Sequence, residues 1–241
     1  MKNSKIMMVA ALSLSLASAA FAGDRVRNNV EKTHDRQDIR QDRAAIANDQ
    51  ADLDRLSDLV MQYNELSSSG SNESKLKSVK AEIAVELRRD MAENHRQVVD
   101  AKKETAESKR EIRSDRREIR SDRREVAEGT ATPKEKHELR DDRRDRRDDR
   151  RDYRDDRADM AGATALLEQK RTIAVELRNI QREIDARGAS SALNARQSAL
   201  LNDYLITSRK EISMGLRELK EDKRELREDR RETREDRRQS N

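Results

Sequence analysis

Residues 109–124 read KREIRSDRREIRSDRR, and this stretch holds two copies of a seven-residue unit. Each unit runs acid, apolar, Arg, variable, Asp, basic, basic, as in Glu111–Arg117 and Glu118–Arg124. Related units fill 138–158 and 218–238. Ala, Leu, Arg, Glu, Lys and Gln dominate the chain on either side, and all of them are good helix formers. The unit therefore predicts long, highly charged helices and no sheet.

The unit also predicts two faces of opposite charge on each helix. At about 100° per residue, its mostly acidic positions one, four and five gather opposite its Arg-rich positions three, six and seven. Neighbours four residues apart, such as Glu111 and Asp115, then carry the same sign, which is mildly unfavourable within one helix. One apolar residue in seven is too few for a coiled-coil seam, which needs two. We therefore expect an acidic face to pair with a neighbour's basic face; a solvated stalk or conditional disorder is the alternative.

Glycine and proline mark where the helices end. The polar stretch around Gly70, the pair Gly129 and Pro133, and Gly188 divide the chain into segments 24–66, 75–128, 133–187 and 191–239. Gly129 suits a left-handed closing position, and Pro133, after the capping residue Thr132, suits the first position of a helix. The sequence thus predicts four long helices.

An internal repeat suggests how these helices are arranged. Residues 36–46 recur at 150–160, and 109–124 recur at 223–238, each shifted by 114 positions. The apolar halves flank the connections near 70 and 188, and the charged halves lie away from them. We predict an all-α fold of two duplicated antiparallel hairpins, 23–128 and 129–241, in an elongated up-down-up-down or coiled-coil-like bundle. The charged ends could then splay apart.

Residues 1–22 have the pattern of a bacterial signal peptide. Lys2 and Lys5 precede an apolar run that is too short to span a membrane, and Ala20-Phe21-Ala22 fits a cleavage site. We expect cleavage after Ala22 and a periplasmic or secreted protein. Losing two Lys leaves 52 basic residues against 50 acidic ones. The pI near 9.3 therefore reflects a thin surplus and not a basic protein.

The composition excludes several classes of function. Among 241 residues, 43% are charged, 33% are hydrophobic and 2% are aromatic, and there is no cysteine. Segment 138–157 holds nine Arg and nine acidic residues, so nucleic-acid binding is not expected. The three His lie far apart, and paired carboxylates such as Asp141 and Asp142 have no evident pocket. We expect no enzyme activity, catalytic residues, metal site, cofactor or small-molecule substrate.

The prediction that remains is an exported structural or interaction protein. It would associate with copies of itself or with a charged envelope component through its charged faces. The 39 Arg outnumber the 15 Lys, and guanidinium groups pair bidentately with carboxylates. An apolar base with charged arms also resembles, in layout only, the trimeric periplasmic holdase of outer-membrane proteins, which implies a chaperone-like alternative. Binding of an envelope polyanion, or weakly of cations, is another. The candidate partner-binding residues are Glu111, Arg113, Asp115, Arg116, Arg117, Glu118, Arg120, Asp122, Arg123 and Arg124.

Overall fold

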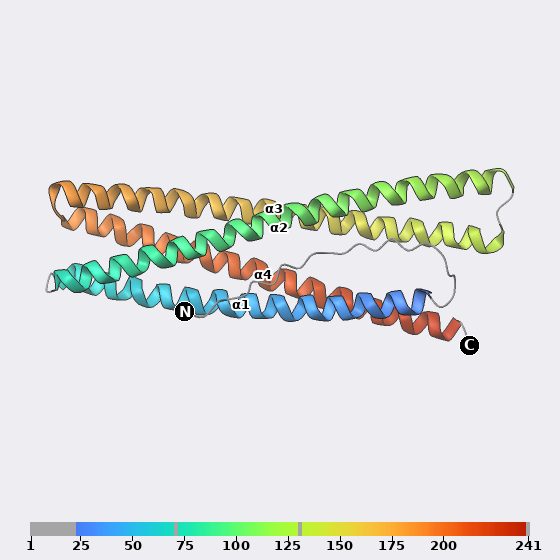
Figure 1. Cartoon of the computed structure of the whole chain (residues 1–241), viewed down its shortest axis with the longest axis horizontal. Helices are drawn as coiled ribbons and strands as arrows, with labels where there is room; N and C mark the ends of the chain where they lie inside the picture. Colours follow the sequence, from blue (N-terminus) through green and yellow to red (C-terminus); the bar gives the residue numbers. More distant parts are fainter. Residues whose placement is uncertain (1–22, 70–71, 130–131, 240–241) are drawn as a thin grey trace. The chain divides into compact units, whose positions relative to one another are not determined.

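A computed structural model describes residues 23–69, 72–129 and 132–239, which form four long helices (Figure 1). These are α1 (Gly23–Ser69), α2 (Glu73–Ala127), α3 (Pro133–Arg187) and α4 (Ser191–Gln239). The described residues contain no strand. The predicted all-α class and the four helical segments are confirmed. The predicted signal peptide, residues 1–22, lies outside the described residues.

The helix ends follow local chemistry. Gly129 follows Glu128, the C-cap residue of α2, and Gly188 directly follows α3. They adopt φ of 73° and 86°, the left-handed conformation that glycine tolerates best. The side chain of Asn72 caps α2 by accepting a hydrogen bond from the Lys75 amide at 3.0 Å. Ser190 does the same for the Leu193 amide of α4 at 3.2 Å. As predicted, α3 begins at Pro133.

The chain packs as two compact units. One comprises Ala44–Glu218, and the other comprises the described residues up to Arg43 with those from Leu219 onward. In the unit formed by the start of α1 and the end of α4, Ile39, Leu219 and Leu226 are buried, while Asp42 and Asp222 are half-buried. Apolar and Asp side chains thus alternate on the buried side of these helix ends.

The Ala44–Glu218 unit holds an apolar core to which all four helices contribute. Consecutive helices run antiparallel, and side chains link α1 to α2, α2 to α3 and α3 to α4. The helix α4 also contacts α1, where Tyr63 donates a hydrogen bond to Gln197 at 3.0 Å. The core lies in the apolar halves that precede or follow the connections near 70 and 188. Its buried residues are Leu53, Leu56, Leu59, Val60, Tyr63, Val79, Ile83, Leu87, Ile173, Leu177, Leu201, Tyr204, Leu205 and Ile212.

Beyond this core, the charged half of α2 packs along α3. Its less exposed residues recur with alternating spacings of three and four, the heptad pattern of a coiled-coil seam. In α2 they are Thr105, Ser108, Ile112, Asp115, Ile119, Asp122 and Val126, and in α3 they are Leu139, Asp142, Arg146, Asp149, Tyr153, Asp156 and Met160. The expectation that one apolar residue in seven precludes such a seam was wrong, because Asp fills most of the second seam positions. We call the paired segments 105–126 and 139–160 the arm.

No helix in the described ranges is both long enough and apolar enough to cross a membrane.

Candidate interaction faces and a buried ion cluster

The register of the arm is fixed where it leaves the core. Ser108 Oγ on α2 donates a hydrogen bond to Asp156 Oδ2 on α3 at 2.7 Å, and Thr105 Oγ1 lies 3.9 Å from Met160 Sδ. One heptad further along each helix, the same register brings Asp115 level with Asp149. Asp115 Oδ2 is buried and has no hydrogen-bond partner in the described part of the chain. Asp residues therefore line one side of the seam between α2 and α3.

Antiparallel pairing places the same heptad positions of both helices on the same side of the arm. Residues one and four places after the first seam residue of each heptad lie on one side of the seam; these first seam residues are Thr105, Ile112 and Ile119 in α2 and Leu139, Arg146 and Tyr153 in α3. In α2 and α3 these positions hold Arg or Lys almost without exception, and all of these basic side chains are exposed. We call this set the basic face: Lys109, Arg113, Arg116, Arg120, Arg123, Arg140, Arg143, Arg147, Arg150, Arg154 and Arg157.

The opposite side of the arm is acidic. It contains the exposed or half-buried residues Glu111, Glu118, Glu125, Asp148, Asp152, Asp155 and Asp159, next to the seam Asp residues. We call these seven residues the acidic face. Partial burial and the nearby carboxylates Asp148, Asp156 and Asp155 raise the pKa of Asp152. Partial burial, Asp155 and Asp156 likewise raise the pKa of Asp159, which Arg217 opposes. Burial is the main cause of both shifts, and the neighbouring carboxylates on this side raise the two pKa values further.

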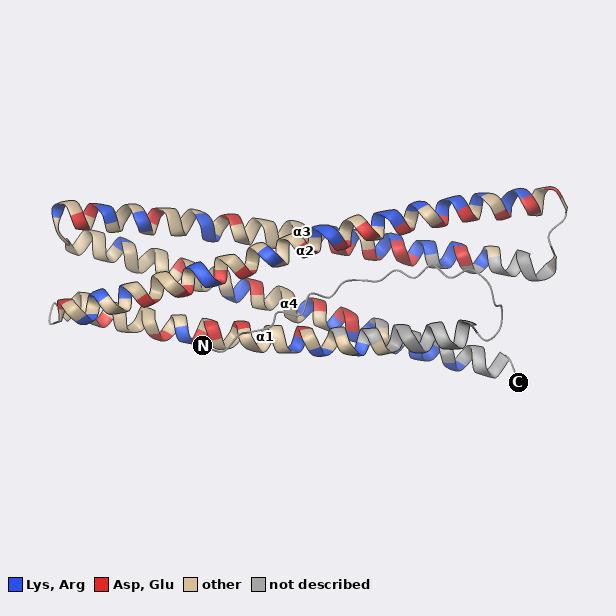
Figure 2. Ribbon diagram, viewed as in Figure 1, with Lys and Arg blue, Asp and Glu red and all other residues tan. Residues whose placement is uncertain are grey.

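Figure 2 shows basic and acidic residues closely spaced along the described arm helices, in contrast to the larger share of other residues around the core. The two helices do not neutralise each other by facing opposite charges. Arg113, Arg116, Arg120 and Arg123 have no ion-pair partner among the residues that the structure describes. Instead, basic residues of both helices lie on one side of the arm, and acidic residues of both helices lie on the other.

The ten predicted partner-binding residues divide among these surfaces. Glu111 and Glu118 belong to the acidic face, whereas Asp115 and Asp122 lie half-buried in the seam against α3. Arg113, Arg116, Arg120 and Arg123 belong to the basic face, while Arg117 and Arg124 are exposed on the side of α2 away from α3. The structure thus separates the two Asp from the other eight. That these residues bind a partner stays a prediction.

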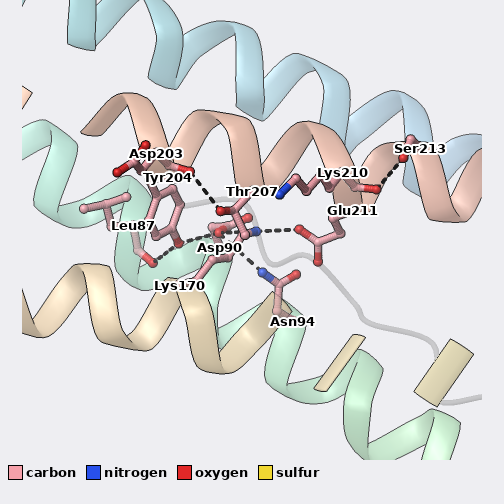
Figure 3. A network of polar contacts seen from close by, with 10 residues as sticks. All are labelled: Leu87, Asp90, Asn94, Lys170, Asp203, Tyr204, Thr207, Lys210, Glu211 and Ser213. Atoms are coloured by element: carbon pink, nitrogen blue, oxygen red, sulfur yellow. Dashed lines mark hydrogen bonds and ion pairs between the residues drawn. The ribbon is translucent and has the colours of Figure 1, made fainter. Parts of the chain in front are cut away.

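Figure 3 shows a second polar site, a buried ion cluster in the core. Lys170 of α3 is fully buried, and its Nζ contacts Asp90 Oδ2 of α2 at 2.8 Å and Glu211 Oε2 of α4. Tyr204 donates a hydrogen bond to the same Asp90 oxygen. Lys170 Nζ lies 5.4 Å from the centre of the Tyr204 ring. Burial is the main cause of the raised pKa values of Glu211 and Tyr204, and Lys170 opposes the shift at Glu211. One cation thus links three helices through two carboxylates.

A small cavity adjoins this cluster. It has a volume of about 20 Å³, and its lining includes Asp49, Asp90, Ser208 and Glu211. Ser208 is buried, and its Oγ has no hydrogen-bond partner in the part of the chain described. Burial raises the pKa of Asp49 to about 7, helped by Glu93, Glu211 and Asp90 and opposed by Lys170. A cavity of this size accommodates one water molecule but no organic substrate.

The ion cluster was not predicted from the sequence. Its one available clue was the position of Lys170 between Leu167 and Ala174, on the stripe of α3 that turns out to be buried. A Lys on an apolar stripe needs a buried partner, because an unpaired buried charge is costly. Asp90 and Glu211 gave no such clue, since carboxylates are abundant in both of their helices.

Searches against protein-family models, curated proteins and solved structures found no match for this chain.

Proposed function

We propose that this protein is an exported, non-enzymatic structural or interaction protein that works by electrostatic association. Its partners are further copies of the chain or a charged component of the bacterial envelope. The observation that carries this proposal is the alignment of like charges on each side of the arm, which leaves a broad basic face and a broad acidic face.

The energetics favour association through many weak contacts. A single exposed ion pair contributes only about 0.2–1 kcal/mol, so one pair would not hold two proteins together. The heptad repeats its charges about every 10.5 Å along each helix, so a complementary partner can form several pairs at once. Arg is well suited to such pairing because its planar guanidinium matches a carboxylate or phosphate in two-pronged geometry.

A non-enzymatic role agrees with the chemistry of the core. The buried Lys170 contacts the half-buried Glu211, and the buried Tyr204 donates a hydrogen bond to Asp90; the adjoining cavity has room for one water molecule. A buried cation in contact with two carboxylates is well placed to fix how helices align. We assign the ion cluster a structural role on this basis.

The test is the mass of the mature protein, measured by light scattering after gel filtration in low and in high salt. We expect species larger than the monomer in low salt that dissociate in high salt, because screening at about 0.15 M acts over about 8 Å. In parallel, binding to dextran sulfate beads and to polylysine beads reports on the basic and acidic faces separately. A protein that stays monomeric and binds neither bead in low salt would contradict the proposal.

A further inference from the structure

We propose that the arm stacks on a second copy of this chain through opposite faces, the basic face of one molecule against the acidic face of the next. This inference rests on the proposed function and specifies its partner. It follows from the presence of both complementary surfaces on a single arm.

The first step is that the two faces cannot satisfy each other within one molecule. They lie on opposite sides of the same pair of helices, with the seam between them. Asp148 forms an ion pair within α3, with Arg151 at 3.7 Å, but this pair does not bring the two faces together. Complementary charge for the basic face, and for the acidic residues other than Asp148 and Glu125, must therefore come from outside the arm.

The second step is that like faces repel. A symmetric dimer places the same surface of each copy against itself. Here that would bring eleven basic side chains against eleven, or seven acidic side chains against seven. Contact between different faces avoids this repulsion and pairs Arg with Asp and Glu.

The third step is that such a contact does not close on itself. When two different surfaces meet, each molecule in a pair still presents one unused face, so a third copy can add. Growth then continues as an open stack unless its geometry closes a ring. The repeat of about 10.5 Å also lets neighbouring arms match in several registers, displaced by whole heptads.

Two variants, each lacking one face, test the inference. In the first, six exposed Arg of the basic face become Gln: Arg113, Arg116, Arg120, Arg143, Arg147 and Arg150. In the second, six residues of the acidic face become their amides: Glu111, Glu118, Glu125, Asp148, Asp152 and Asp155. A control with the same charge change as the first variant carries Gln at six exposed basic positions outside the arm: Lys77, Arg88, Arg96, Arg178, Arg182 and Arg209. Circular dichroism establishes that each variant remains helical.

Stacking through opposite faces predicts a distinctive result on mixing. In low salt the wild-type protein and the control should grow in mass as concentration rises, whereas each face variant alone should remain monomeric. An equimolar mixture of the two variants should reach twice the monomer mass and grow no further, because each contributes one intact face. High salt should dissociate this pair.

Three outcomes would overturn the inference: a wild-type mass that stops at a dimer, a single face variant that associates like the wild type, or a mixture that stays monomeric. The bead assays show whether the proposed function fails as well. If copies do not stack but wild-type protein binds dextran sulfate and the first variant does not, the proposed function stands and only the stacking is wrong. If neither stacking nor bead binding occurs, both are wrong.

Discussion

At the scale of single residues, the fully buried Lys170 is the clearest departure from expectation. Its ammonium group contacts Asp90 and Glu211, which come from helices far apart in the sequence. Replacing a buried ion pair entirely with apolar residues is often tolerated, whereas removing one partner leaves charge that nothing compensates. The cluster therefore responds very differently to single and to combined substitutions.

Lys170→Met is expected to destabilise the protein by about 3–5 kcal/mol, because it leaves Asp90 and Glu211 facing each other without their shared cation. The urea midpoint of unfolding, followed by circular dichroism, measures this loss. Adding Asp90→Asn and Glu211→Gln should restore part of the stability. Lys210→Met, at an exposed position of α4, is the control and should change stability by less than about 0.5 kcal/mol. Equal effects of Lys170→Met and Lys210→Met would disprove the role of the cluster.

Asp49 makes stability depend on pH in an unusual direction. Its pKa rises from 3.8 to about 7 in the folded chain, so between these values the folded protein holds a proton that the unfolded chain has released. Stability should therefore fall as pH increases from about 4 through 7. Asp49→Asn should flatten this dependence and stabilise the protein at pH 8 by about 1–2 kcal/mol, a figure reduced because the side chain is only half-buried.

Urea unfolding at several pH values checks this prediction. Asp58→Asn, at an exposed position of the same helix, is the matched control and should leave the pH dependence unchanged. An unchanged pH dependence in Asp49→Asn would show that Asp49 ionises normally.

At the scale of elements, the helix boundaries were predictable because they depend on local chemistry. Gly129, Pro133 and Gly188 act through their own backbone geometry, so their effects do not depend on what the helices pack against. The arm seam was not predictable in this way. An Asp at a seam position looks the same in the sequence as an Asp in solvent, and only packing against α3 distinguishes Asp115 from Glu118.

Asp115→Leu is expected to stabilise the arm. It replaces a buried carboxylate oxygen, Oδ2, that has no hydrogen-bond partner among the described residues, and it puts an apolar side chain next to Ile112 and Ile119. The gain should be about 1–3 kcal/mol, the range for removing an unsatisfied buried polar group. Hydrogen exchange of the amides in 109–124 measures it as slower exchange. Ser114→Leu, on the exposed side of α2, should produce no such slowing. Faster exchange in Asp115→Leu would mean that the carboxylate stabilises the seam.

At the scale of the whole molecule, the near-neutral net charge conceals the distribution of charge. Fifty-four basic residues almost balance 50 acidic ones, a mixture with no net preference for either sign of partner. In the arm the two signs lie on opposite sides, so each surface presents a strong charge of its own. If copies associate as proposed, we expect the response of the molecular mass to salt to depend on the arrangement of charges and only weakly on their sum.

The sequence by itself determined the helical class, the helix ends and the separation of charge around each helix. All three depend on residues within a few positions of one another, through backbone propensity, capping and the 100° step of the helix. Only the tertiary structure decided which side of each charged helix faces its neighbour, and so aligned like charges into two faces. It alone also brought Asp90, Lys170 and Glu211 together, because contacts between distant helices depend on the packing of the entire core and leave no local pattern in the chain.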